Sequence, residues 1–174
     1  QERARMSLFC SDKCSWRAKT LIYGENECWE WRSNRHWKGY GMMTTAFNGS
    51  LFGWDFGLYI SDTTNLSFRY TTVGTDINTT STSGAGLTTG VWYAIAVDKD
   101  ATGKIRIYVD GVMKGSSTPA DSSMYATGLP FFIGINAASS PLNGWIEELR
   151  ITKGVARYAS DGGYTVATSA FPIG

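Results

Sequence analysis

The chain has 174 residues, of which 43% are hydrophobic and 14% aromatic, a composition that suits one compact domain spanning residues 1–174. Its 16 basic and 15 acidic residues give a formal net charge of +1, so no strong electrostatic field favours nucleic acid or an anionic membrane surface as a partner. No apolar run approaches the roughly 20 residues that span a bilayer, which predicts a soluble protein with no membrane partner.

Short alternating runs separated by Gly, Asn, Asp, Ser and Thr clusters recur along the chain, whereas helical periodicity is almost absent. In the first half, Gly57–Ser61 and Leu66–Thr71 are expected to form a hairpin around the polar residues 62–65. The Thr-, Ser- and Gly-rich stretch Thr72–Gly90 reads as a long loop.

The second half begins with three expected strands in a meander: Trp92–Asp98, Lys104–Asp110 and Val112–Gly115. On the middle strand, alternation sends Ile105, Ile107 and Val109 to the core, and Lys104, Arg106, Tyr108 and Asp110 to a face that is at least partly wet.

Two further strands are expected at Leu129–Ile135 and Trp145–Thr152. In the second of these, Ile146 and Leu149 break strict alternation, and a β-bulge near Glu147 and Glu148 would reconcile them. The pattern as a whole predicts an all-β antiparallel protein.

Four ordered motifs carry a resemblance to a known family: Gly90–Val97, Ile105–Gly111, Phe132–Gly134 and Asn143–Ile151. Together they resemble laminin G-like domains of the concanavalin A-like lectin/glucanase superfamily, over roughly residues 50–172. The resemblance implies a two-sheet antiparallel jelly-roll sandwich.

The resemblance weakens in the Cys- and Trp-rich stretch of about residues 1–50. There, Leu21–Tyr23 and Trp29–Trp31 are candidates for the strands with which the family usually opens. The ending Arg150–Tyr158, followed by Phe171–Pro172, is similar to versions of the domain found in bacteriophage virion and tail proteins. It implies a virion or extracellular location.

Catalysis is not expected. The glucanases of the superfamily carry catalytic carboxylates that alternate along one strand, and no such motif occurs here. The adjacent Glu147 and Glu148 would point to opposite faces of a regular strand. His36 is the only histidine, and there is no Gly-x-Ser-x-Gly nucleophile elbow.

Zinc is a candidate because three sulfurs and an imidazole could complete a tetrahedral shell, from Cys10, Cys14, Cys28 and His36. Their intervals depart from the usual Cys-x2-Cys spacing, and a disulfide with one free thiol fits the odd cysteine count equally well. No cofactor is therefore predicted, and zinc is left open.

Calcium is left open in the same way, because relatives often hold it at loop oxygens on the sandwich rim. Asp55, Asp98 and Asp100 could supply such oxygens. An Asp in a hairpin turn more often caps its own backbone.

Exposed aromatic residues beside polar groups suggest a ligand site, because sugar recognition uses flat rings next to hydrogen-bonding groups. The candidate carbohydrate-binding residues are Trp31, Trp37, Tyr40, Asn34, Arg35 and His36. Trp92 and Trp145 are instead assigned to the core, as are Trp29 and Trp54.

Two hypotheses follow from the sequence. One is a non-enzymatic, virion-associated recognition module that binds carbohydrate on a host or environmental surface. The alternative is a structural or decoration protein that docks on a capsid, a tail or a second copy of itself through protein contacts.

Overall fold

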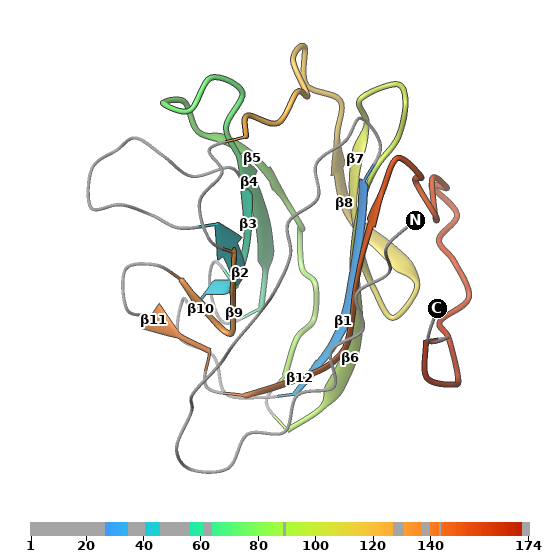
Figure 1. Cartoon of the computed structure of the whole chain (residues 1–174). Coiled ribbons are helices and arrows are strands. Elements are labelled where there is room, and N and C mark those ends of the chain that lie inside the picture. Colours follow the sequence, from blue (N-terminus) through green and yellow to red (C-terminus); the bar gives the residue numbers. More distant parts are fainter. Residues whose placement is uncertain are drawn as a thin grey trace.

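The computed structural model describes residues 27–34, 41–45, 56–60, 64–88, 90–126, 131–136, 140–142 and 144–171. Two five-stranded antiparallel sheets face each other in these ranges (Figure 1). The first sheet has the order β12 (Trp145–Lys153), β1 (Glu27–Asn34), β6 (Trp92–Lys99), β7 (Ile105–Val109) and β8 (Val112–Ser117). The second has the order β5 (Asn78–Ser81), β4 (Leu66–Tyr70), β3 (Phe56–Ile60), β2 (Gly41–Thr45) and β9 (Phe131–Ile133).

A short ribbon of β10 (Ile135–Asn136) and β11 (Ser140–Pro141) adjoins the second sheet. The described ranges contain no helix, and so none that could cross a membrane. The expected all-β antiparallel sandwich is confirmed.

The core lies between the two sheets and consists of the residues at alternate positions along the strands whose side chains point inward. Ile95 and Ile107 of the first sheet are fully buried, and they face Leu58 and Phe68 of the second. Burial of each such side chain contributes about 1.5–3 kcal/mol relative to leaving it in water. The predicted meander of β6, β7 and β8 is confirmed by their antiparallel pairing.

Two features of the second sheet were not expected. Strand β5 lies inside the stretch assigned to a long loop and pairs with β4 along its length. Its sequence Asn78-Thr-Thr-Ser81 is polar because only Thr80 is buried, so it gives no apolar alternation. The strand expected at Leu129–Ile135 is divided at Gly134, whose φ of 75° ends β9 before β10 begins.

The β-bulge in β12 is confirmed. The register of β12 against β1 shifts between Glu30, which faces Arg150, and Arg32, which faces Glu147. Glu148 adopts a φ of 52°, a left-handed conformation that is uncommon for a residue with a side chain. The bulge lets both Ile146 and Leu149 reach the core.

The outer face of the first sheet is covered by the C-terminal segment 154–171, which we call the strap. Figure 1 shows it in red on the side of the first sheet away from the core. The interpretation of this face as partly wet is therefore wrong for Tyr108, which is fully buried, and for Arg106, which is 6% exposed. Strand alternation identifies the outer side of a sheet but not a later segment that covers it.

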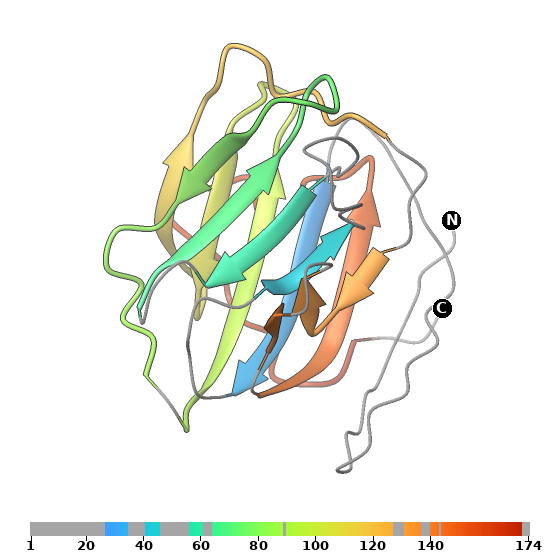
Figure 2. The ribbon, with the colours of Figure 1, turned by 90° about the vertical axis from the view of Figure 1, so that its left-hand side faces the viewer.

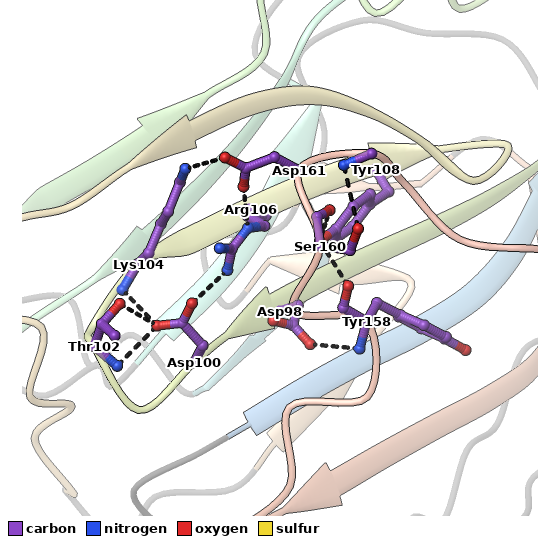
Figure 3. Close-up of polar contacts among 10 residues, drawn as sticks. Asp98, Asp100, Thr102, Lys104, Arg106, Tyr108, Tyr158, Ser160 and Asp161 are labelled. Atoms are coloured by element: carbon purple, nitrogen blue, oxygen red, sulfur yellow. Dashed lines mark hydrogen bonds and ion pairs between the residues drawn. The ribbon is translucent and has the colours of Figure 1, made fainter.

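Ion pairs and tyrosine contacts hold the strap in place (Figure 3). Asp161 contacts Lys104 and Arg106, each at 2.7 Å, and Arg106 also pairs with Asp100 at 2.7 Å. The Tyr108 hydroxyl lies 3.0 Å from the Ser160 carbonyl oxygen that accepts its hydrogen bond. Lys104 and Asp110 of the supposedly wet face are half-buried and exposed, respectively.

Asp98, in β6, connects this strand to the strap through a hydrogen bond. Its Oδ2 accepts a hydrogen bond of 3.1 Å from the Tyr158 amide, and the side chain has no exposed surface. Among the described residues, Oδ1 has no hydrogen-bond partner. Burial raises the pKa of this carboxyl above its usual range, although the Tyr158 amide and Arg106 oppose the rise.

Asp100 should make the domain sensitive to acid. Partial burial alone would raise the pKa of this carboxyl, but hydrogen bonds from Thr102 and Arg106 lower it to about 2. A group with a lowered folded-state pKa stabilises the protein above its unfolded pKa, so this contribution is lost as the pH falls from 3.8 towards 2. We expect Asp100→Asn to remove about 2 kcal/mol of stability at pH 7 and little at pH 2.

Urea denaturation at pH 7 and at pH 2 gives the free energy of unfolding of the variant and of the unaltered protein. Asp161→Asn is the control, because this carboxylate also pairs with Arg106 but is 57% exposed, so its loss should matter less. If the free energy of unfolding of the Asp100→Asn variant fell as much between pH 7 and pH 2 as that of the unaltered protein, Asp100 would not be the source of the acid sensitivity.

Candidate functional site

The outer face of the second sheet carries a group of polar and aromatic side chains; Figure 2 looks onto this face. Leu58, Leu66 and Phe68 point into the core, so alternation places Tyr59 and Arg69 on the outside. We call the set the Arg69 face and define it by Tyr59, Ser67, Arg69, Thr79 and Ser81.

The guanidinium of Arg69 lies over the Tyr59 ring, with its central carbon 5.4 Å from the ring centroid. A cation over an aromatic face at this distance is worth about 0.5–1 kcal/mol on an exposed surface. Arg69 is exposed and has no carboxylate within ion-pair distance in the part of the chain that the structure describes. Within the described ranges, the Arg69 charge is therefore not neutralised by a carboxylate.

Gly57 makes room for the Tyr59 ring. It lies opposite Arg69 in the β3–β4 ladder, and a Cβ at this position would be 2.6 Å from Tyr59 Oη and 2.7 Å from Cε2. Real Cβ atoms essentially never approach other atoms so closely. The ring can thus lie along the sheet beneath Arg69 because residue 57 has no side chain.

Hydroxyl groups continue this face towards the edge of the sheet. Ser67 lies opposite Tyr59 on one side and Ser81 on the other, and the two serine Oγ atoms are 2.8 Å apart. Thr79 is opposite Arg69. Ser67 is only 4% exposed, so the groups that a ligand can reach are the Arg69 guanidinium and the hydroxyls of Thr79 and Ser81. They suit a ligand with an anionic group and several hydroxyls of its own.

Sequence reasoning missed Arg69 and Tyr59, although a signal was present. In Leu66-Ser-Phe-Arg-Tyr70, strict alternation puts Ser67 and Arg69 on the face opposite the apolar residues. The ring contact itself could not be foreseen, because it requires the register that sets Gly57 against Arg69.

Two of the six residues predicted to bind carbohydrate lie in the described ranges, both in β1. Asn34 ends β1 and lies opposite Trp92 on one side and Trp145 on the other. Trp31 lies opposite Ile95, a core residue. The other candidates, Arg35, His36, Trp37 and Tyr40, lie outside the described residues.

Trp92 and Trp145 are not core residues, so their assignment is wrong. They are 43% and 38% exposed. Their neighbours Tyr93 and Ile146 occupy the inward positions, so alternation turns both tryptophans to the outer face of the first sheet. Large aromatic residues favour cores on average, but in β12 the bulge decides which residues point inward. Trp54 lies outside the described residues, and Trp29 lies opposite the core residue Val97.

The zinc site stays a prediction, because three of its four ligands lie outside the described residues. Cys10, Cys14 and His36 lie outside them, and Cys28 is in β1, opposite Asp98 and Thr152. No group of three or more His, Cys, Asp or Glu side chains placed to hold a metal occurs among the described residues.

Asp98 and Asp100 do not fit a calcium site, because their oxygens serve the protein itself. Asp98 holds the strap, and Asp100 caps its own turn by accepting a 2.8 Å bond from the Thr102 amide and pairing with Arg106. Asp55, the third candidate, lies outside the described residues.

Asp76, at the rim, is likewise satisfied by protein donors. It accepts hydrogen bonds from Thr71 Oγ1 at 2.6 Å, from the Thr72 amide and hydroxyl, from the Val73 amide and from Asn78 Nδ2. Desolvation raises the pKa of this carboxyl, but these bonds outweigh it and hold the pKa well below its usual range. The loop itself therefore stabilises the charge of Asp76.

A family model described as the concanavalin A-like lectin/glucanases superfamily matches residues 29–159. The chain belongs to this superfamily. The match starts upstream of the range of roughly 50–172 given by the motifs, and it includes strand β1. Trp29–Trp31 is therefore part of the family fold.

Solved structures with the same fold are similar to the chain at low sequence identity. A sialidase carbohydrate-binding module (CBM40) of Ruminococcus gnavus, bound to α2,3-sialyllactose, is 12% identical with a TM-score of 0.61, and the alignment covers 80% of each chain. Domains LG4-5 of the mouse laminin α1 chain are 15% identical with a TM-score of 0.57, over 84% of this chain and 41% of that one.

The receptor-binding domain of botulinum neurotoxin type G is also similar, at 15% identity and a TM-score of 0.55, over 76% of this chain and 35% of that one. No curated protein gives a significant sequence match. These neighbours establish the fold.

Gly57→Ala should displace the Tyr59 ring without removing any functional group. We expect the Arg69–Tyr59 contact to break, because the new Cβ occupies the position of the ring, while stability changes by less than about 1 kcal/mol. Near-ultraviolet circular dichroism reports the ring, and thermal unfolding reports stability. Gly162→Ala is the matched control, since its nearest atom would be 3.5 Å away. An unchanged aromatic signal in Gly57→Ala would show that the ring does not lie over Gly57.

Proposed function

We propose that the protein is a non-enzymatic recognition module that binds carbohydrate at the Arg69 face. The observation that carries the proposal is the exposed Arg69 guanidinium stacked on Tyr59, with no carboxylate partner in the described ranges. The exposed residues Thr79 and Ser81 lie on the same face, and their hydroxyls can exchange hydrogen bonds with a sugar, whereas Ser67 is only 4% exposed and is bonded to Ser81.

A negatively charged sugar is the ligand class that this chemistry fits best. The guanidinium can bind a carboxylate through two parallel hydrogen bonds, while the Tyr59 ring, which lies between Gly57 and the guanidinium, holds Arg69 in place. The R. gnavus module of the same fold is bound to sialyllactose, an acidic oligosaccharide, which supports this class.

The proposal that the module is not an enzyme is supported by the carboxylates of the described residues. Retaining glycosidases need two carboxyl groups about 5–5.5 Å apart beside the substrate. No Asp or Glu belongs to the Arg69 face as described, and Glu148 accepts a hydrogen bond from the Phe171 amide of the strap.

We further propose a place on a virion or in the extracellular medium, where a recognition module can meet surface glycans. The support is the similarity of Arg150–Tyr158 to bacteriophage virion domains. In the structure, this sequence forms the end of β12 and the start of the strap.

Docking on another protein is the second candidate. The exposed apolar residues Val73, Ile77 and Tyr125 favour it. Tyr125 packs against Gly74, and its amide donates to the Thr71 carbonyl, so these residues share one rim of the sandwich. Such a patch suits contact with a capsid, a tail or a second copy of this chain.

Replacing Arg69 tests carbohydrate binding directly. We expect the protein to bind sialylated glycans on an array, and we expect Arg69→Ala to weaken binding by roughly thirtyfold, because about 2 kcal/mol of charge-assisted hydrogen bonding is lost. Titration calorimetry with sialyllactose gives the Kd of each variant. Arg69→Lys, which keeps the charge without the planar fork, should recover part of the affinity.

Two controls accompany this test. Lys114→Ala removes a cation elsewhere on the chain and should leave the Kd unchanged. Trp37→Ala examines the segment favoured by the sequence, and a larger loss there than in Arg69→Ala would move the site to that segment. The absence of saturable binding to any glycan, together with a stable multimer by light scattering, would favour docking instead.

A further inference from the structure

The outer face of the first sheet carries two exposed tryptophans in one row. Trp92 on β6 and Trp145 on β12 both lie opposite Asn34 on β1, the strand between them. Adjacent strands are about 4.8 Å apart, so residues in register on alternate strands have backbones separated by about 10 Å. Two indole groups thus stand side by side, with the position of a small polar residue between them.

The strap stops short of this row. The outward positions of β6 become steadily more buried along the strand: Trp92 is 43% exposed, Ala94 is half-buried, and Ala96 and Asp98 have no exposed surface. On β12, the last described residue of the strap, Phe171, donates its amide to Glu148, and its ring lies against Arg150. The sheet is therefore covered over most of its outer face, and the tryptophan row is left at the uncovered end.

The size of the exposed surface decides what can bind there. An aromatic side chain of this kind has 150–250 Å² of surface, so the two exposed fractions amount to about 200 Å². A stable protein interface needs about 800 Å² from each partner. Residues near the row in sequence and register, Arg32 and Glu147, are charged and lie opposite each other. The row is too small and too closely bordered by charge to be the apolar centre of a protein interface.

We propose that Trp92 and Trp145 form a second binding surface, at which the uncharged rings of an oligosaccharide stack. Indole faces are large, rigid and apolar, so a sugar ring can stack on them. Since the two rings belong to alternate strands, a ligand must be an oligosaccharide rather than a monosaccharide to contact both. The inference rests on the proposed function for its ligand class but uses a different face of the sandwich.

This second surface differs from the Arg69 face in charge and in position. The Arg69 face offers a cation and so selects an anionic group, whereas the tryptophan row selects ring shape. The two lie on opposite sheets, and both face away from the core. Because they face in opposite directions, the two sites suit two separate glycan chains, and they raise the overall avidity where both chains are engaged at once.

A neutral β-1,4-linked N-acetylglucosamine hexasaccharide is the probe for the tryptophan row, and sialyllactose is the probe for the Arg69 face. We expect Trp92→Ala and Trp145→Ala each to weaken the hexasaccharide about tenfold in Kd, with little change for sialyllactose. Arg69→Ala should do the reverse. Tyr125→Ala is the matched control, because that ring is similarly exposed, at 45%, but belongs to another surface.

A second measurement uses the full chain labelled with 5-fluorotryptophan, with resonances assigned through Trp92→Phe and Trp145→Phe, so that it does not depend on how the alanine variants fold. We expect these two resonances to move as the hexasaccharide is added. Unmoved resonances, or a double alanine variant that binds the hexasaccharide normally, would overturn the second surface even if Arg69-dependent binding holds. A dimer that dissociates on the double substitution, without hexasaccharide binding, would also overturn it and assign the row to a contact between two copies.

Discussion

The buried guanidinium of Arg106 is the interaction on which the outer surface of the first sheet depends. It is 6% exposed and is neutralised by Asp100 from its own hairpin and by Asp161 from the strap. A buried charge is tolerated when it is paired and hydrogen-bonded, so removing either carboxylate would lower the free energy of unfolding. Because one of these partners comes from the strap, the same contact that satisfies Arg106 also holds the strap across β6 and β7 and buries Tyr108.

The strap divides the molecule into surfaces with different roles. Over most of its outer side the first sheet behaves as the middle layer of the domain, with the core on one face and the strap on the other. The second sheet has no such cover over Arg69, which remains exposed to solvent. Its candidate ligand groups therefore lie on regular strands whose register is fixed by the core beneath them, and such positions hold side chains more accurately than loops do.

The alternation of apolar and polar residues was enough to predict the antiparallel strands, the meander and the bulge, because burial of one sheet face is a local property of a strand. The two-sheet sandwich came from the resemblance to the concanavalin A-like superfamily. Alternation could not predict the strap, since Asp161 meets Arg106 across 55 residues and no periodic pattern records that contact. Strand β5 was missed because hydroxyl groups and an edge position leave no apolar signal. The carbohydrate-binding residues expected around His36 stay a prediction, since most of them lie outside the described ranges. The proposed Arg69 face could not be read from the sequence, because the proximity of Arg69, Tyr59 and Gly57 depends on strand register.

The β-bulge at Glu148 determines which residues of β12 reach the outer face of the first sheet. It places two residues of β12 opposite one of β1, so Ile146 and Leu149 both face the core, and Trp145 is outside. If β12 kept its length but ran as a regular strand through this point, residue 145 would share the face of Leu149 and turn inward, and Ile146 would turn to solvent. Deleting one of the two bulge residues, Glu147 or Glu148, would instead make the strand regular and leave Trp145 outside. The aromatic character of this face thus depends on the extra residue of the bulge as much as on the tryptophans themselves.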